Sequence, residues 1–240
     1  MTVHLAPNDI WTQDEIDFVL EQKKHLSCRI PEIKEILEKF GNKDAFFDCY
    51  VSGGAIASIL QKEVPNDIDL YFVSAKNANF FKTFFANPQN RIKYSVVTSS
   101  HSRDSYDGPH IFVSSNAATL ASKIQLIYSN HGIPKHVTQI FDLLHCTSWY
   151  SPSLDKLYIN HRIFEVIKNK QMIQNTKKSV LPKRIAKFKK RKYTIPEYIL
   201  TYDYQNKKSI HIDNFFPDKM IDELVLYQKK YDEMKLKVII

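Results

Sequence analysis

One stretch, residues 46–73, restricts the fold more than any other, because the spacing of its apolar residues changes along it. Phe46–Val51 is an apolar and aromatic run that predicts a buried strand, and Ser52-Gly53-Gly54 predicts a tight turn. Residues 55–60 are small and apolar, which predicts a short helix. Asp67–Val73 alternates with a period of two, as a strand with one polar face does. This order of elements predicts a mixed α/β fold.

Asp67 and Asp69 give the second predicted strand its chemistry. Residues two apart on a strand point to the same side, so both carboxylates project from one face. Carboxylates held this close repel each other unless a cation lies between them. Oxygen ligands at this density suit Mg²⁺ or Mn²⁺. The spacing therefore predicts a metal site formed by Asp67 and Asp69.

The Gly-Gly turn is the matching feature on the other side of the predicted helix. Glycine is scarce, with five in 240 residues, and Gly53 and Gly54 are adjacent. Without Cβ atoms their backbone can approach a triphosphate closely, and Ser52 and Ser58 could add hydroxyl donors. An isolated Gly pair is usually only a turn, and an isolated Asp-x-Asp is usually a solvated face. Together, in this order and spacing, they predict a nucleotide site.

The other elements follow from capping signals and periodicity. Thr12 and Glu15 form a capping box that begins a helix ending near Lys24, and a second helix follows Pro31 and stops at Gly41. Further on, the patterns predict helices over 77–86 and 134–140, strands over 92–98, 111–113 and 124–128 and from residue 141, and a polar mobile loop over 99–109.

These elements predict two parts. Residues 1–150 form an α+β head in which two helices precede a small mixed sheet, and residues 151–240 form a mainly helical, basic tail. Ser151-Pro152-Ser153 marks the predicted boundary.

Positive charge is concentrated in the tail. Residues 161–240 carry 19 Lys and Arg against 9 Asp and Glu, and residues 177–192 carry nine basic side chains and no acid. Such a run suits a phosphate backbone, and Phe188, Tyr193 and Tyr198 could stack on bases. The candidate RNA-binding residues are Lys183, Arg184, Lys187, Lys189, Lys190 and Arg191. The alternative is a solvated helix surface.

The stretch from Ser52 to Leu70 resembles the head-domain signature of the polymerase-β nucleotidyltransferase superfamily, and most of all its class II CCA-adding and bacterial poly(A) polymerase branch. That signature joins a Gly-Gly pair, a helix with Leu near its end, a Pro and Asp-x-Asp-Leu. Ser115-Asn116-Ala117 resembles the motif near the nucleotide ribose, and Arg184–Phe188 resembles the neck-helix segment. The resemblance implies Asn116 as a further nucleotide contact.

The resemblance also implies a third carboxylate from a later strand. Asp142 is the best candidate, because it opens an apolar run; the alternative for it is a capping role, and Asp104 and Asp107 are rivals. His145 and Cys146 follow and are interpreted as core packing. Three family motifs are absent: Ala57-Ser58, residues 112–114 and residues 177–181 stand in their places, so no base preference carries over.

The resulting hypothesis is a Mg²⁺- or Mn²⁺-dependent enzyme that transfers a nucleotide from a nucleoside triphosphate to an RNA 3′ end, with tRNA the favoured acceptor. The alternatives are a toxin or defence factor that modifies a protein or tRNA, and an inactive RNA-binding module. Three dispersed cysteines, Cys28, Cys49 and Cys146, predict neither a disulfide framework nor a zinc site. With no signal pattern and no membrane-length apolar run, we expect a cytoplasmic protein without a membrane partner.

Overall fold

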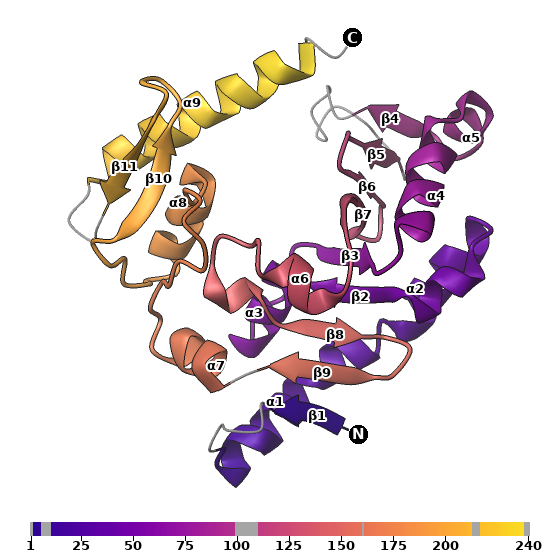
Figure 1. Ribbon diagram of the computed structural model, residues 1–240, viewed down its shortest axis with the longest axis horizontal. Helices are drawn as coiled ribbons and strands as arrows, with labels where there is room; N and C mark the ends of the chain where they lie inside the picture. Colours follow the sequence, from indigo (N-terminus) through magenta and orange to yellow (C-terminus); the bar gives the residue numbers. More distant parts are fainter. Residues whose placement is uncertain (1, 6–10, 99–109, 160, 213–216, 238–240) are drawn as a thin grey trace.

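A mixed sheet forms the centre of the molecule, with helices on its faces and a separate tail beside it (Figure 1). The computed structural model describes residues 2–5, 11–98, 110–159, 161–212 and 217–237. The predicted loop over 99–109, with Asp104 and Asp107, lies outside these residues.

The sheet has nine strands within the described part of the chain, in the order β1-β9-β8-β2-β3-β7-β6-β5-β4. Their bounds are β1 Thr2–Leu5, β2 Cys49–Ser52, β3 Ile68–Phe72, β4 Val96–Thr98, β5 Ile111–Val113, β6 Ala117–Thr119, β7 Ile124–His131, β8 Trp149–Ser151 and β9 Lys156–Ile159. The mixed α/β class is confirmed. Strands β2 and β3, which flank the Gly-Gly turn, occupy the middle of the sheet.

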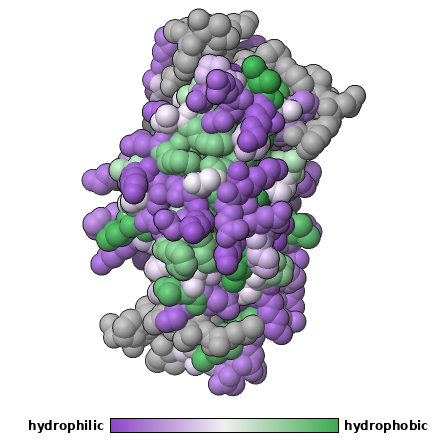
Figure 2. Space-filling view, turned by 90° about the vertical axis from the view of Figure 1, so that its right-hand side faces the viewer, coloured by the Kyte–Doolittle hydropathy of each residue, from purple (hydrophilic) through white to green (hydrophobic). Residues whose placement is uncertain are grey.

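Helices cover the sheet and connect its strands. They are α1 Gln13–Ser27, α2 Ile30–Lys39, α3 Gly54–Leu60, α4 Ala75–Ala86, α5 Pro88–Lys93, α6 Pro134–Thr138 and α7 His161–Lys168, with 3-10 helices η1 Lys43–Phe47 and η3 Leu144–Cys146. Helix α4 packs on β3 and β7, and α3 packs against α1 and α7. The side of the molecule turned toward the viewer in Figure 2 mixes hydrophobic and hydrophilic residues.

The capping box of α1 is confirmed. Thr12 Oγ1 accepts a hydrogen bond from the Glu15 backbone N–H, and the Glu15 carboxylate accepts one from the Thr12 N–H. Trp11, just before the cap, contacts the rings of His161 and Phe164 on α7. The first helix is therefore fixed both at its cap and against the end of the head.

A buried ion pair ties α1 to the β8–β9 hairpin. The fully buried ammonium of Lys23 lies 2.7 Å from Asp155 Oδ2, and Ser27 Oγ and Tyr150 OH donate hydrogen bonds to Asp155 Oδ1 at 2.7 and 2.6 Å. Partial burial raises the pKa of Asp155, but the hydrogen bonds from Lys23, Tyr150 and Ser27, together with the Lys23 charge, outweigh burial and hold this pKa below its ordinary value. A buried charge left without its partner is costly, so this pair fixes the hairpin onto the head.

The tail has its own apolar core. It consists of α8 Pro182–Lys190, α9 Asp218–Lys237 and an antiparallel hairpin, β10 Ile199–Asp203 with β11 Lys208–Ile212. The helices were predicted and the hairpin was not. The apolar faces of α8, β10, β11 and α9 meet in a core separate from the one under the sheet.

The division between the two cores differs from the predicted boundary at residue 150. Strand β9 extends the central sheet, and Ile163 and Ile167 of α7 pack in the head core, so the head continues through α7. The reason is the long-range pairing of β8 with β2, which no local pattern reveals. Two local predictions also change: residues 46–47 belong to η1, and residues 92–93 end α5.

Among the described helices, none combines the length and apolar character that crossing a membrane requires.

Candidate active site

The strand–turn–helix–strand unit places both aspartates beside the Gly-Gly turn. Strands β2 and β3 are antiparallel, with Ser52 opposite Asp69. Gly53, the residue after Ser52, therefore lies beside Asp69 where β2 ends. Asp67 immediately precedes β3 and Asp69 is its second residue. Ile68 and Leu70 are buried on the opposite face, which fixes the direction of both carboxylates.

Gly53 is required by its conformation and by its neighbour. Its φ is +90°, a backbone region that residues with a side chain rarely adopt. A Cβ on Gly53 would lie 3.1 Å from Asp69 Oδ2, which is tighter than ordinary contact. A Cβ on Gly54 would meet no atom within 4 Å. Gly53 therefore serves the fold, and Gly54 leaves open space beside the aspartates.

The aspartate pair carries a charge that the protein alone does not compensate. Burial, and then the charge of Asp67, raise the pKa of Asp69 from 3.8 to about 7, and the positive charges of Arg184 and Lys187 oppose this only in part. A bound cation would relieve the same repulsion. Carboxylate oxygens are the donors that Mg²⁺ and Mn²⁺ prefer, so the pair fits the predicted metal ions.

Gln125 is a residue of the site that the sequence analysis missed. Strand β7 runs parallel to β3, with Gln125 in register with Asp69, and Gln125 Nε2 donates a hydrogen bond of 3.0 Å to Asp67 Oδ2. An amide thus stands beside the two carboxylates on the neighbouring strand. The only signal in the sequence was the alternating pattern of residues 124–128, which gives the face of the strand but not its partner.

A cavity of about 480 Å³ lies between the head and helix α8 of the tail. The head contributes Gly53, Gly54, Asp67, Asp69, Tyr71, Gln125, Phe141 and Cys146 to its lining, and the tail contributes Lys183, Arg184, Lys187, Phe188 and Arg191. Ile185 of α8 is buried in the tail core, whereas Phe188 and the four basic residues line the cavity that contains the aspartates. The cavity therefore has an acidic wall and a basic wall.

Two arginines of the basic wall are held by acids. Arg184 is paired with Asp142, and Arg191 with Glu63 of the loop after α3. Arg191 Nη2 also lies 3.4 Å from Ser58 Oγ, as a hydrogen-bond donor. These pairs connect α8 to the head on both sides of the cavity.

Asp142 is not brought together with Asp67 and Asp69 in the structure. Within the described residues, no group of three Asp, Glu, His or Cys side chains is arranged to hold a metal ion. Asp142 comes before η3 rather than on a strand, and its carboxylate pairs with Arg184. Its role as third metal ligand stays a prediction, and the observed partner gives it a competing role as a support for Arg184.

The predicted hydroxyl and ribose contacts do not line the cavity either. Ser52 is fully buried and donates a hydrogen bond to the Ser148 carbonyl at 2.7 Å, and Ser58 is buried beneath Arg191. Asn116 lies in the exposed β5–β6 turn. The residue of β6 that pairs with Gln125 is Thr119, three positions further along the chain. At about 3.3 Å per residue, Asn116 is roughly 10 Å along the sheet from Thr119.

The six predicted RNA-binding residues do not share one surface. Lys183, Arg184, Lys187 and Arg191 line the cavity, while Lys189 pairs with Asp218 of α9 at 2.7 Å and Lys190 is exposed elsewhere on α8. Arg184, Lys187 and Arg191 share a side because they lie three, four and seven positions apart.

His145 and Cys146 are buried, as the sequence analysis expected. The His145 ring packs edge-on against Phe188, at 4.3 Å between centroids, and against Tyr193. Burial, with the nearby charges of Arg184, Arg191 and Lys187, lowers the pKa of His145 to about 3, so the ring is neutral at pH 7. This packing supports α8 from beneath.

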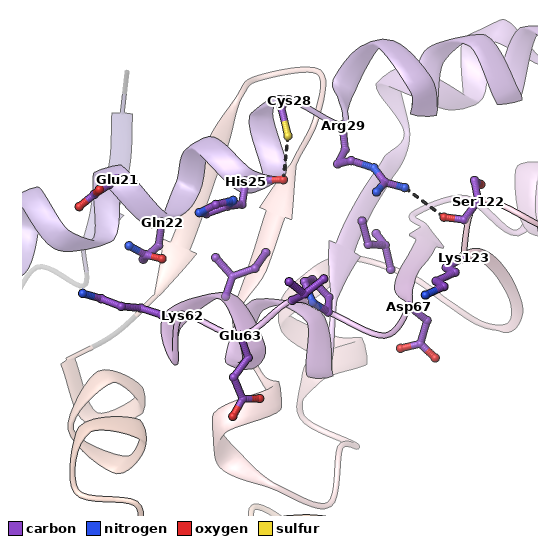
Figure 3. Close-up of a pocket in the computed structure, with 14 residues that line it drawn as sticks. Glu21, Gln22, His25, Cys28, Arg29, Lys62, Glu63, Asp67, Ser122 and Lys123 are labelled. Atoms are coloured by element: carbon purple, nitrogen blue, oxygen red, sulfur yellow. Dashed lines mark hydrogen bonds between the residues drawn. The ribbon is translucent and has the colours of Figure 1, made fainter. Parts of the chain in front are cut away.

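A second cavity, of about 560 Å³, meets the first at Asp67 (Figure 3). In Figure 3 the carboxylates of Glu63 and Asp67 lie across this cavity from the α1 side chains of Glu21, Gln22 and His25. Its lining mixes acids and bases, so its charge points to no single class of ligand.

The strand, the Gly-Gly turn, the short helix and the Asp-x-Asp strand thus meet at one cavity. The family model described as Gabija anti-defense 2 family protein matches residues 30–170, more than half of the chain. The chain belongs to the Gabija anti-defense 2 family.

Two similar solved structures are both CCA-adding enzymes. One, from Thermotoga maritima in complex with tRNA, shares 16% identity with a TM-score of 0.44; the other, an apo form, shares 14% with a TM-score of 0.42. Each comparison covers 76% of this chain and 42% of the other, so the chain spans less than half the length of these enzymes. No curated protein matches the sequence.

Proposed function

We propose that the chain is a metal-dependent nucleotidyltransferase that moves a nucleoside monophosphate from a nucleoside triphosphate to an acceptor. The observation that carries the proposal is the uncompensated aspartate pair on β3, which faces a basic helix across a nucleotide-sized cavity. Mg²⁺ or Mn²⁺ bound by Asp67 and Asp69 would supply charge stabilisation for the triphosphate and its leaving group.

In the proposed reaction, an acceptor hydroxyl oxygen forms a bond to the α-phosphorus. The bond from that phosphorus to the oxygen bridging to the β-phosphate breaks, pyrophosphate leaves and the hydroxyl proton passes to solvent. Asp67 and Asp69 would hold the metal ion that supplies positive charge beside the reacting phosphate, and Gln125 orients Asp67 through its hydrogen bond. Gly54 leaves room for the phosphates beside the pair.

The family assignment favours an acceptor that belongs to the Gabija defence system, because the family is described by its action against that defence. In this proposal, nucleotide transfer to a defence component would inactivate it. This corresponds to the alternative of a nucleotidyltransferase that acts in a conflict between a host and its invader.

A second candidate acceptor is an RNA 3′ end, with tRNA favoured. The basic excess of the tail supports it, although four of the basic residues on α8 and directly after it face the cavity rather than an outer surface. The signature resembling CCA-adding enzymes suits the same acceptor.

One experiment separates these acceptors. The protein is incubated with Mg²⁺ and each of the four α-³²P-labelled nucleoside triphosphates, in parallel with total RNA and with purified components of the Gabija defence system. Label that survives nuclease but not protease identifies a protein acceptor, and the reverse identifies RNA. Labelled product that forms without either acceptor would contradict both candidate acceptors. No labelled product at all, in parallel with an authentic nucleotidyltransferase that labels its own acceptor, would overturn the proposed activity.

A further inference from the structure

The four cations of the basic wall fall into two kinds. Arg184 and Arg191 are each engaged by a carboxylate of the head. Lys183 and Lys187 line the same cavity and are exposed, and within the described residues neither ammonium has an ion pair with an Asp or Glu. The cavity therefore holds two ammonium groups whose charge nothing on its own wall neutralises.

The fold fixes the direction of these two lysines. Lys183 and Lys187 are four residues apart on α8 and thus lie one turn apart on the same face. Ile185 on the opposite face is anchored in the tail core, and Phe188 packs in the same core at the edge of the cavity. Arg184 and Arg191 tie the helix to the head. Rotation of α8 that would turn the lysines to bulk solvent would break these contacts.

The chemistry of the two walls selects the ligand. The aspartate wall attracts a cation, and the lysine wall attracts an anion, so the cavity suits a metal-bound polyanion with charge spread over several oxygens. A triphosphate has this character: its α-phosphate must lie at the aspartate pair, and its other phosphates need separate positive partners. Lysine binds phosphate as a compact point charge.

We propose that Lys183 and Lys187 bind the β- and γ-phosphates of the nucleoside triphosphate and stabilise the departing pyrophosphate. This inference rests on the proposed function, and it removes two lysines from the candidate RNA-binding surface. It makes helix α8 part of the substrate site, although α8 lies more than a hundred residues after the aspartates in the sequence.

The test compares ligands that differ only in their phosphates. Binding of each nucleoside triphosphate, the matching monophosphate and inorganic pyrophosphate is measured by calorimetry with Mg²⁺ for wild type, Lys183→Gln, Lys187→Gln and the double variant. Lys190→Gln is the matched control, because Lys190 is an exposed lysine of the same helix that does not line the cavity. Thermal unfolding checks that each variant is folded.

We expect each cavity-facing substitution to weaken triphosphate and pyrophosphate binding about tenfold, the usual effect of losing one charge-assisted contact. Monophosphate binding should change less than about twofold, and Lys190→Gln should match wild type. Equal losses for mono- and triphosphate, an unchanged double variant, or a wild type that binds no triphosphate would overturn the inference. If triphosphate binding depends on these lysines but no acceptor is ever labelled, the proposed transfer fails while the binding role stands.

Discussion

The two walls of the cavity hold their charges by different means. The acidic wall is built from residues 53–69, where a central strand and a strained glycine set both carboxylates within one short stretch of chain. The basic wall is built from a helix whose position depends on a separate core and on two ion pairs. The difference teaches that the metal-binding half of such a site can be local in sequence, whereas its phosphate-binding half depends on the tertiary fold.

The strongest test of the acidic wall is removal of one carboxylate. Asp67→Ala or Asp69→Ala should lower nucleotide transfer by about 10³-fold or more, on the order of 4 kcal/mol of transition-state stabilisation. Asp44→Ala, at an exposed acid of η1, is the control and should retain wild-type activity. Initial rates of labelled product are the measurement. Near wild-type rates in either cavity variant would refute the metal-site proposal.

The charge of Asp69 should appear as a dependence of stability on pH. Its pKa in the folded protein is about 7, above the ordinary 3.8, so well below pH 3.8 the carboxyl is protonated in both states and has no effect on stability. As pH rises toward 7 the unfolded chain releases the proton first, and the folded state becomes less stable by at most about 4 kcal/mol. Asp69→Asn should therefore raise the free energy of unfolding at pH 8.

Denaturant unfolding at pH 4 and pH 8, without divalent ions, measures this difference, which should be much smaller at the lower pH. Mg²⁺ should stabilise wild type at pH 8 and leave Asp69→Asn nearly unchanged, because binding to the folded state raises its stability. A variant that is equally stable with wild type at both pH values would show that Asp69 carries no such penalty.

The two glycines of the acidic wall have different roles, Gly53 in the stability of the fold and Gly54 in access of the ligand. Gly53→Ala should destabilise the protein by about 1–3 kcal/mol, because its positive φ and the nearby Asp69 oxygen both oppose a Cβ. Gly54→Ala should leave the melting temperature nearly unchanged but weaken triphosphate binding, since its Cβ enters open space beside the carboxylates. Thermal melts and calorimetry give the two readouts. The reverse pattern would contradict this division of roles.

Asp142 decides whether the walls share a residue. If it only supports Arg184, Asp142→Asn should cost about 1 kcal/mol of stability and lower transfer no more than about tenfold. A loss as large as that of Asp67→Ala would instead assign it to the metal site, as the sequence resemblance implied. The double variant Asp142→Asn with Arg184→Gln distinguishes the two: if Asp142 acts through Arg184, adding the second substitution changes little.

The smallest expected effect concerns the outer surface of the tail. Lys190 and Lys192 are exposed and do not line the cavity. If RNA is the acceptor, replacing both with Ser should reduce the slope of log affinity against log salt by about 1.4, or about 0.7 per lost phosphate contact on single strands. Nucleotide binding should be unchanged. An unaltered slope in a filter-binding titration would assign both lysines to a solvated surface.

Features that depend on neighbouring residues could be predicted from the sequence, whereas features that depend on the tertiary fold could not. The capping box at Thr12, the strand bearing Asp69 and the Gly53 turn were predicted because each depends on residues near in sequence. Gln125 was missed because only the pairing of β7 with β3 brings it to Asp67.

The tail shows the same limit. The sequence predicts a basic run over residues 177–192 within a mainly helical tail, yet which lysines face the cavity depends on how Ile185 and Phe188 pack. Ser52 and Ser58 are predicted to bind the nucleotide because of their place in the motif; both are buried in the structure, and this role stays a prediction.

The Lys23–Asp155 pair determines where the chain can be truncated without loss of the head fold. It also determines when the head can fold during synthesis. A fragment ending at residue 150 contains every head residue of the Asp-x-Asp site, but it leaves the Lys23 ammonium buried without its carboxylate and exposes β8 as a sheet edge. A fragment ending after α7 keeps both. Nascent chains that have not yet delivered residues 155–159 should thus remain sensitive to protease, although the residues of the aspartate strand were translated long before.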